Sequence, residues 1–348
     1  MIALEEHAVV DLVDLSIAYE SRLGRVLAVD SVSLSIRRNK LVAIVGESGC
    51  GKTTLGLSII GLLATPPARR SGGKVLYKGV DLLSLGSEEA RLFRGTEIAM
   101  IFQEPLTSLN PVYKIGGQME EAIAIRDSRR DEAYRKSRDS MTKRGRGELK
   151  HSHGERRKEV IAALNMVRIP DAERTLDHYP FELSGGMRQR VMIAMALSQK
   201  PSLLIADEPT TAVDVTTQAQ ILKLMRNLMN EVKTSILLIT HDLALAAQVA
   251  DRVAVMYAGQ IVEEGDVFEF FSEPLHPYSQ GLLACIPSGS RQESKLKPVE
   301  GAVLNLASLP PGCKFAPRCP QAMKRCCGEK PQLVTIRGSH RVACHRHQ

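Results

Sequence analysis

The sequence predicts an α/β fold built around a largely parallel β-sheet, and three observations point to it. Continuous apolar runs at residues 41–45, 203–206 and 236–239 are typical of strands buried on both faces of a sheet. Helical patterns lie between them, for example over residues 191–197 and 217–229. A glycine-rich segment directly follows the first run. Together these features indicate one large α/β domain in the 348-residue chain.

The segment after the first strand has the composition of a phosphate-binding loop. It consists of Gly46, Glu47, Ser48, Gly49, Cys50, Gly51, Lys52 and Thr53, followed by Thr54. It fits the pattern of glycine, any four residues, glycine, lysine, then serine or threonine. The glycines let backbone N–H groups point at phosphate oxygens, and the following helix adds its positive end. We therefore expect a nucleotide site in which Lys52 reaches the β- and γ-phosphates and Thr53 holds Mg²⁺.

The second strand ends in two carboxylates, Asp207 and Glu208. A carboxylate that leaves a buried strand beside a phosphate loop can hold the Mg²⁺ shell, and its neighbour can polarise a water for in-line attack. We assign Asp207 to the metal and Glu208 to the role of catalytic base. The pair alone is weak evidence, since it also fits a simple strand end.

A second phosphate cradle is predicted at Ser184, Gly185 and Gly186, which open a helix over residues 191–197. A serine and two glycines at a helix start leave N–H donors free for an anion. One nucleotide does not need two such cradles within one chain. The economical explanation is that this cradle closes on the ATP held by a partner subunit.

With both cradles in place, the sequence resembles the ATP-binding cassette (ABC) proteins, whose Leu-Ser-Gly-Gly signature stands at residues 183–186. The resemblance covers nearly the whole chain. It implies a P-loop NTPase with a RecA-like core, an ABC helical subdomain and an N-terminal antiparallel β portion. Gln103 matches the Q-loop, His241 the switch histidine after the third strand, and Asp214 the D-loop.

The resemblance also implies roles for these residues. Gln103 contacts the γ-phosphate and the metal and couples them to membrane subunits, and His241 contacts the γ-phosphate. Tyr19 stacks on adenine, although a tyrosine on a strand face would read the same. A hairpin is expected over residues 253–262, where two apolar runs flank a turn.

Three longer stretches, at residues 103–111, 187–196 and 276–279, resemble the ATPases of oligopeptide and dipeptide importers. This branch implies a second ABC ATPase subunit, favoured as a paralogue, two transmembrane permease subunits and an extracytoplasmic substrate-binding protein. The ATPase would lie at the cytoplasmic face of the membrane as a peripheral subunit without touching the cargo. Nickel chelates and oligosaccharides are alternative cargoes in the branch.

Two other function classes fit the sequence less well. A soluble ABC ATPase that acts on nucleic acid or ribosomes usually has two cassettes in one chain or long coiled coils, and neither pattern occurs here. An exporter ATPase is disfavoured by the importer-like stretches. No apolar stretch reaches the roughly 20 residues that a membrane-spanning helix needs, and the first residues do not resemble a secretory signal.

The net charge of +7 is concentrated in two segments. Residues 126–158 hold 13 Lys and Arg against 6 Asp and Glu, and residues 313–348 hold 8 against 1, so each segment carries +7 and the rest about −7. We expect residues 126–158 to form an exposed insertion, so that deleting residues 127–157 leaves ATP hydrolysis largely intact. A contact with lipid headgroups or a regulatory role is the alternative.

The predicted organisation is an ABC domain over residues 1–265 with a helical subdomain at about 104–190, a linker over 266–299 and a small cysteine-rich segment over 300–348. The candidate metal ligands of that last segment are Cys313, Cys319, Cys326 and Cys344. Four thiolates can hold a [4Fe–4S] cluster. The segment also resembles the cysteine-bearing C-terminal segment of peptide-importer ATPases, and the resemblance implies such a cluster, because some members carry one. Zinc and unliganded thiols are the alternatives, although the close cysteine pairs of zinc modules are missing. Cys327 could replace Cys326.

Overall fold

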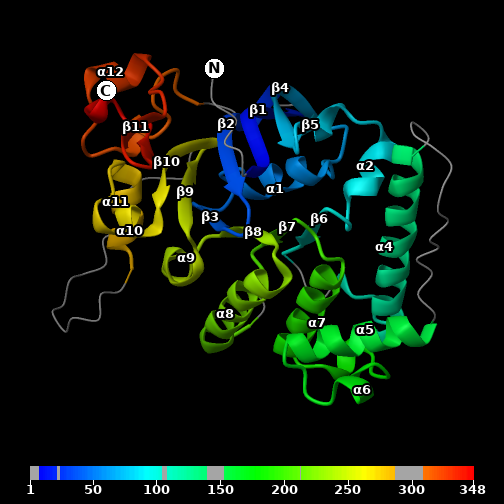
Figure 1. Ribbon diagram of the computed structural model, residues 1–348. Helices are drawn as coiled ribbons and strands as arrows, with labels where there is room; N and C mark the ends of the chain where they lie inside the picture. Colours follow the sequence, from blue (N-terminus) through cyan, green and yellow to red (C-terminus); the bar gives the residue numbers. More distant parts are fainter. Residues whose placement is uncertain (1–7, 22–23, 104–107, 139–152, 212, 287–308) are drawn as a thin grey trace. The chain divides into compact units, whose positions relative to one another are not determined.

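The structure is a computed structural model that describes residues 8–21, 24–103, 108–138, 153–211, 213–286 and 309–348 (Figure 1). The chain divides into two compact units. The first unit comprises Met1–Leu83 and Leu237–Gln348, and the second comprises Ser84–Ile236. The predicted linker and the start of the cysteine-rich segment fall partly on residues 287–308, outside the described residues.

The first unit contains an antiparallel sheet with the strand order β2-β1-β4-β5. Its strands are β1 (Ala8–Ser21), β2 (Gly24–Arg37), β4 (Ala68–Tyr77) and β5 (Val80–Asp81). Leu12 on β1 lies opposite Leu34 on β2 and Val75 on β4, and all three side chains are buried. This sheet is the antiparallel N-terminal portion that the resemblance implies.

A second sheet runs through the first unit in the order β11-β12-β10-β9-β3-β8. Its strands are β3 (Leu41–Val45), β8 (Ser235–Thr240), β9 (Arg252–Tyr257), β10 (Gln260–Asp266), β11 (Val334–Arg337) and β12 (His340–Val342). β3 pairs with β9 in parallel, and β9 with β10 in the predicted hairpin. β3 and β8 are buried along their whole length, which confirms two of the predicted strands.

The helices of the first unit are short. They are α1 (Lys52–Ile60), α9 (Leu243–Val249), α10 (Val267–Ser272), α11 (Pro277–Ala284) and α12 (Lys324–Gly328), with 3₁₀ turns at Ala316–Arg318 and His345–His347. The red segment in Figure 1, residues 309–348, contains α12, β11 and β12, and we call it the cysteine lobe. β12 pairs with β10, which joins the lobe to the second sheet.

The second unit is mainly helical, with two parallel strands, β6 (Ile98–Ile101) and β7 (Leu203–Asp207). Its helices are α2 (Ser87–Phe93), α4 (Ile115–Arg138), α5 (His153–Met166), α6 (Ala172–Thr175), α7 (Gly185–Ser198) and α8 (Val215–Val232), with a 3₁₀ turn at Pro180–Glu182. α4, α5 and α7 pack on one another. β7 is fully buried, as the sequence predicts.

The prediction that residues 126–158 form an exposed insertion is wrong at its start. α4 continues to Arg138, and Arg126 and Asp127 are buried. Their charges pair within the fold, so a basic composition does not place them in solvent. Residues 139–152 lie outside the described residues. A deletion of residues 127–157 would therefore remove the buried Asp127 and the start of α5, contrary to the expectation of a dispensable surface insertion. None of the helices described is long and apolar enough to span a bilayer.

Candidate functional site

The phosphate loop, Gly46–Thr53, lies between β3 and α1, and its backbone leaves no room for side chains at two glycines. A Cβ on Gly46 would lie 2.2 Å from the Met256 carbonyl oxygen, and one on Gly51 would lie 2.1 Å from that of Ala28. Gly51 also has a φ of 107° and forms the N-cap of α1, where no side chain caps the helix. The first amides of α1 therefore have no side-chain acceptor at the cap and can serve an anion.

Lys52 folds back over the loop that precedes it. Its side chain is buried, and Nζ donates to the carbonyl oxygens of Gly46 (2.8 Å) and Glu47 (2.9 Å). Cys50 is a small buried side chain beside it, and burial raises the pKa of this thiol. Nζ also lies 3.8 Å from Cys50 Sγ, so its partners are neutral, and an ammonium group can exchange such partners for the stronger charged acceptors of a phosphate.

Other predicted residues of the first unit lie near this loop or at strand ends. The Tyr19 hydroxyl, on β1, is 3.4 Å from Thr54 Oγ1 on α1, so the structure brings this tyrosine to the phosphate-loop helix. Ser48, Gly49 and Thr53 are exposed. His241 follows β8 and is also exposed, one residue before the N-cap of α9.

In the second unit, Gln103 and Glu208 meet directly. Gln103 Nε2 donates to Glu208 Oε2 at 3.1 Å, and Thr211 Oγ1 donates to the Glu208 carbonyl oxygen at 2.8 Å. Glu208 has a φ of 44°, in the left-handed region that non-glycine residues rarely adopt. Such backbone strain is typical of functional positions. Asp207, the last residue of β7, is buried.

The signature segment forms the start of α7. Ser184 is exposed and is the N-cap of this helix, with its Oγ accepting from Met187 N at 3.3 Å. Gly185 and Gly186 are the first residues of the helix, and a Cβ on Gly186 would lie 3.3 Å from Thr217 Cγ2. The segment therefore presents bare helix amides, as a phosphate cradle requires.

Thr217, which lies close to Gly186 of the signature segment, also contacts Asp214. Asp214 is the N-cap of α8 and accepts from Thr217 N at 3.0 Å, and this N–H lowers the pKa of the carboxyl. The structure thus gives Asp214 a capping role that sequence reasoning missed. Ala212, within the matched D-loop, lies outside the described residues, as do residues 104–107 after Gln103.

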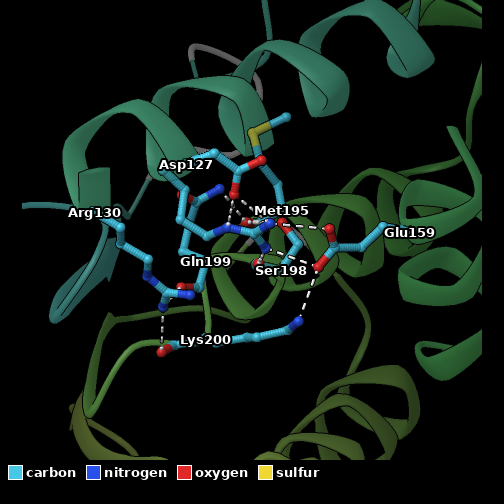
Figure 2. A network of polar contacts seen from close by, with 8 residues as sticks. Asp127, Arg130, Glu159, Met195, Ser198, Gln199 and Lys200 are labelled. Atoms are coloured by element: carbon cyan, nitrogen blue, oxygen red, sulfur yellow. Dashed lines mark hydrogen bonds and ion pairs between the residues drawn. The ribbon is translucent and has the colours of Figure 1, made fainter. Parts of the chain in front are cut away.

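A buried ion-pair network at the C-terminal end of α7 was also missed (Figure 2). The Arg126 guanidinium donates to Asp127 (2.7 Å), to Glu159 (2.8 Å) and to the Ser198 carbonyl oxygen (2.6 Å). Lys200 Nζ lies 3.1 Å from Glu159. Hydrogen bonds from Arg126 are the main cause that lowers the pKa of Glu159 to about 2. No local motif marks these residues, because they come from three separate helices and the loop after α7.

The four candidate ligands of the cysteine lobe lie close enough for a charge on one to affect the others. Burial raises the pKa of Cys313 to about 11 and also raises those of Cys319 and Cys344, and negative charge on Cys326 would raise all three further. Cys326 is buried and Cys327 exposed. Within the described residues, however, no three or more His, Cys, Asp or Glu side chains are arranged to hold a metal ion.

Comparison with known proteins shows the family to which this chain belongs. Residues 29–211 match the family "ABC transporter", and residues 262–326 match "Oligopeptide/dipeptide transporter, C-terminal region". The oligopeptide transport ATP-binding protein AppD of Bacillus subtilis is 47% identical over 91% of this chain and 90% of its own length. The dipeptide transport ATP-binding protein DppD of Haemophilus influenzae is 44% identical over 97% and 95%.

Solved structures with the same fold include nucleotide-bound cassettes. The ATP-binding cassette MJ0796 in a post-hydrolysis state with ADP and Pi is 27% identical, with a TM-score of 0.60 over 74% of this chain and 98% of that one. The cbiO1 subunit of the Clostridium perfringens transporter complex cbiONQ is 25% identical, with a TM-score of 0.61 over 77% and 92%. The predicted P-loop NTPase fold is thereby confirmed.

Proposed function

Because this chain belongs to the ABC ATPases of oligopeptide and dipeptide importers, we propose that it hydrolyses ATP to power uptake of these peptides through separate membrane subunits. The observation that carries the ATPase assignment is the phosphate loop, where close backbone approach requires glycine at positions 46 and 51 and Gly51 forms the N-cap of α1. The peptide assignment is supported by the match over residues 262–326 and by the relatives' names.

The residues divide the chemistry between them. The loop amides and Lys52 bind the phosphates, and Tyr19 stacks on adenine. Glu208 accepts a proton from the attacking water, and its hydrogen bond to Gln103 supports a shared role in orienting that water. His241 contacts the γ-phosphate.

Mg²⁺ would be held by Thr53, Gln103 and Asp207, and it would neutralise charge that develops on the phosphate oxygens. Hydroxyl, amide and carboxylate oxygens are the donors that this hard cation prefers, so the residue set fits. Asp207 is a buried acid at a strand end, which is consistent with holding a cation.

A second ABC subunit, proposed to be a paralogue, completes each site. The amides at Ser184, Gly185 and Gly186 would cradle the γ-phosphate of the ATP that the partner holds, with Asp214 nearby. The support is that Ser184 is exposed and that both glycines leave the start of α7 without side chains.

The membrane partners are proposed to dock on an apolar surface of the second unit. Val112, Tyr113 and Phe181 are 71%, 62% and 69% exposed. Their two segments are adjacent, because Ile115 N donates to the His178 carbonyl oxygen at 2.9 Å. Exposed apolar residues of this size in a cluster are typical of interaction sites. Two permease subunits and an extracytoplasmic binding protein would complete the importer, with this chain at the cytoplasmic face.

If the membrane subunits dock on this surface, substitutions in it should reduce peptide transport. Replacing Tyr113 and Phe181 by serine should lower peptide uptake by the assembled complex at least about tenfold, because losing buried aromatic contacts weakens an interface by several kcal/mol. ATP binding to the isolated chain should be unchanged. Val80→Ser is the matched control, since Val80 is 42% exposed but lies on β5 of the other unit. Normal uptake by the double variant would contradict the docking site.

The cysteine lobe is proposed to hold a [4Fe–4S] cluster through Cys313, Cys319, Cys326 and Cys344. Burial raises the pKa of the Cys313, Cys319 and Cys344 thiols, and together with Cys326 they make up the four donors that a cluster needs. Metal binding would have to deprotonate them and assemble them into a ligand group. Burial of Cys326 and exposure of Cys327 favour Cys326 as the third ligand.

The adjacent residues Cys326 and Cys327 allow a matched test of the proposed cluster. Anaerobically purified wild-type protein and Cys327→Ser should be brown and contain iron and acid-labile sulfide, whereas Cys326→Ser should lose both. A colourless wild-type protein, or one with stoichiometric zinc, would contradict the cluster. Loss in Cys327→Ser and retention in Cys326→Ser would reverse the ligand assignment.

A further inference from the structure

Glu47 places a negative charge inside the loop proposed to bind an anion. It is the second residue of the phosphate loop, and its side chain is 21% exposed. An unpaired carboxylate at this position would repel the triphosphate of ATP, because charges of the same sign interact strongly where water is partly excluded. Some other group must neutralise it for the loop to bind ATP well.

That group comes from the cysteine lobe. Arg318 forms a two-pronged ion pair with Glu47, with Nη1–Oε2 at 2.8 Å and Nη2–Oε1 at 3.0 Å, and the arginine side chain is only 5% exposed. Paired hydrogen bonds of this kind fix orientation as well as charge. The lobe therefore both neutralises Glu47 and holds its side chain in one direction.

The backbone of Glu47 is held as well. Its N–H donates to the Tyr278 hydroxyl at 3.0 Å, and its carbonyl oxygen accepts from Lys52 Nζ at 2.9 Å. Tyr278, on α11, is fully buried. Thus α11 and the cysteine lobe each hold one side of the same loop residue.

An aromatic cluster sets the position of Arg318. Phe315, three residues earlier, is buried against Tyr257 (ring centroids 5.2 Å apart) and Tyr278 (5.4 Å). Lys314 is also buried, with Nζ 2.8 Å from Asp30 and donating to the Ala258 carbonyl oxygen at 2.7 Å. These contacts fix the position of the 3₁₀ turn that ends at Arg318. The Arg318 guanidinium is therefore held in place to pair with Glu47.

We propose that Arg318 is a positioning residue of the nucleotide site, acting through Glu47, and that the cysteine lobe thereby sets the ATP affinity of its own phosphate loop. The inference rests on the proposed ATPase function. It adds a role for the lobe that does not require a metal. Arg318 directly precedes Cys319, so the ion pair with the phosphate loop lies next to a candidate metal ligand in the sequence.

ATP binding by the purified full chain tests the proposal. Arg318→Ala should raise the Kd and KM for ATP about tenfold, the change that one unscreened charge near the phosphates produces, with kcat changed less than about threefold. Adding Glu47→Gln to this variant should restore most of the affinity, because the repelling charge is gone. Arg318→Lys keeps the charge without the paired hydrogen bonds and should fall between.

Arg325→Ala is the matched control, since Arg325 belongs to the same lobe but pairs with Glu329 at exposed positions. It should bind ATP like wild type. The inference is overturned if Arg318→Ala also binds ATP like wild type. It is also overturned if Arg318→Ala and Glu47→Gln each weaken ATP binding and their effects add, because that result would mean that the ion pair only stabilises the fold. If Arg318→Ala does not fold, Arg318→Lys is measured instead: a weaker ATP affinity than wild type supports the inference, and an unchanged affinity overturns it. Failure of the wild-type chain to bind ATP would instead overturn the proposed function.

Discussion

ATP hydrolysis by the assembled complex is expected to fall at least about a hundredfold when Glu208 is replaced by glutamine, while ATP still binds. Glutamine keeps the size of the side chain and can still bond to Gln103 and Thr211, but it cannot accept a proton from water. Binding should survive because the phosphate loop, with Lys52, lies on other elements. Phosphate release and the Kd for ATP, measured on the same preparation, separate the two effects.

Glu231→Gln is the matched control for this variant. Glu231 is an exposed carboxylate on α8 of the same unit, so the substitution makes the same chemical change away from the site. Its turnover should equal that of wild type. Unchanged turnover in Glu208→Gln would remove this residue from the role of catalytic base, and a loss of ATP binding would show that it acts on affinity instead.

Replacing Arg126 by alanine should lower the free energy of unfolding of the full chain by about 3 kcal/mol, because it leaves the buried Asp127 without this counter-charge and removes one of the two cations that face Glu159. Arg126 joins Asp127, Glu159 and the end of α7, whose other end carries the signature segment. Urea unfolding measures the change. Arg91→Ala, which breaks ion pairs at the surface of the same unit, should have little effect.

The same network predicts how the Arg126→Ala effect depends on pH. The pKa of Glu159 is lowered to about 2 in the folded protein from an ordinary 4.5. Its stabilising contribution is therefore complete above about pH 4.5 and is lost as the pH falls toward 2. The difference in unfolding free energy between wild type and variant should shrink over this range. A constant difference would mean that Arg126 does not stabilise the Glu159 carboxylate.

The parts that sequence reasoning predicted correctly are those with a local signal. β3, β7 and β8 are continuous apolar runs, and such runs are buried wherever a sheet is covered on both faces. The phosphate loop and the signature segment are read from fixed spacings of glycine, serine and lysine. In these places the chemistry depends on the backbone, so neighbouring residues carry enough information.

The parts that were missed depend on partners distant in the chain. Arg126 opens a basic stretch that reads as a surface insertion, and its burial becomes evident only once Glu159 and the end of α7 surround it. Arg318 and Glu47 are 271 positions apart. Cys326 and Cys327 are adjacent, so which one is buried depends on how α12 packs.

If ATP hydrolysis by this chain drives peptide import, the transport can be measured as peptide uptake into vesicles. These would contain the complete complex, with ATP on the side of the ABC subunits and labelled peptide with the binding protein on the other. Peptide should accumulate in the vesicles only when ATP is present, and it should not accumulate with Glu208→Gln. Accumulation of a nickel chelate or an oligosaccharide in place of peptide, or ATP hydrolysis without any accumulation, would contradict it.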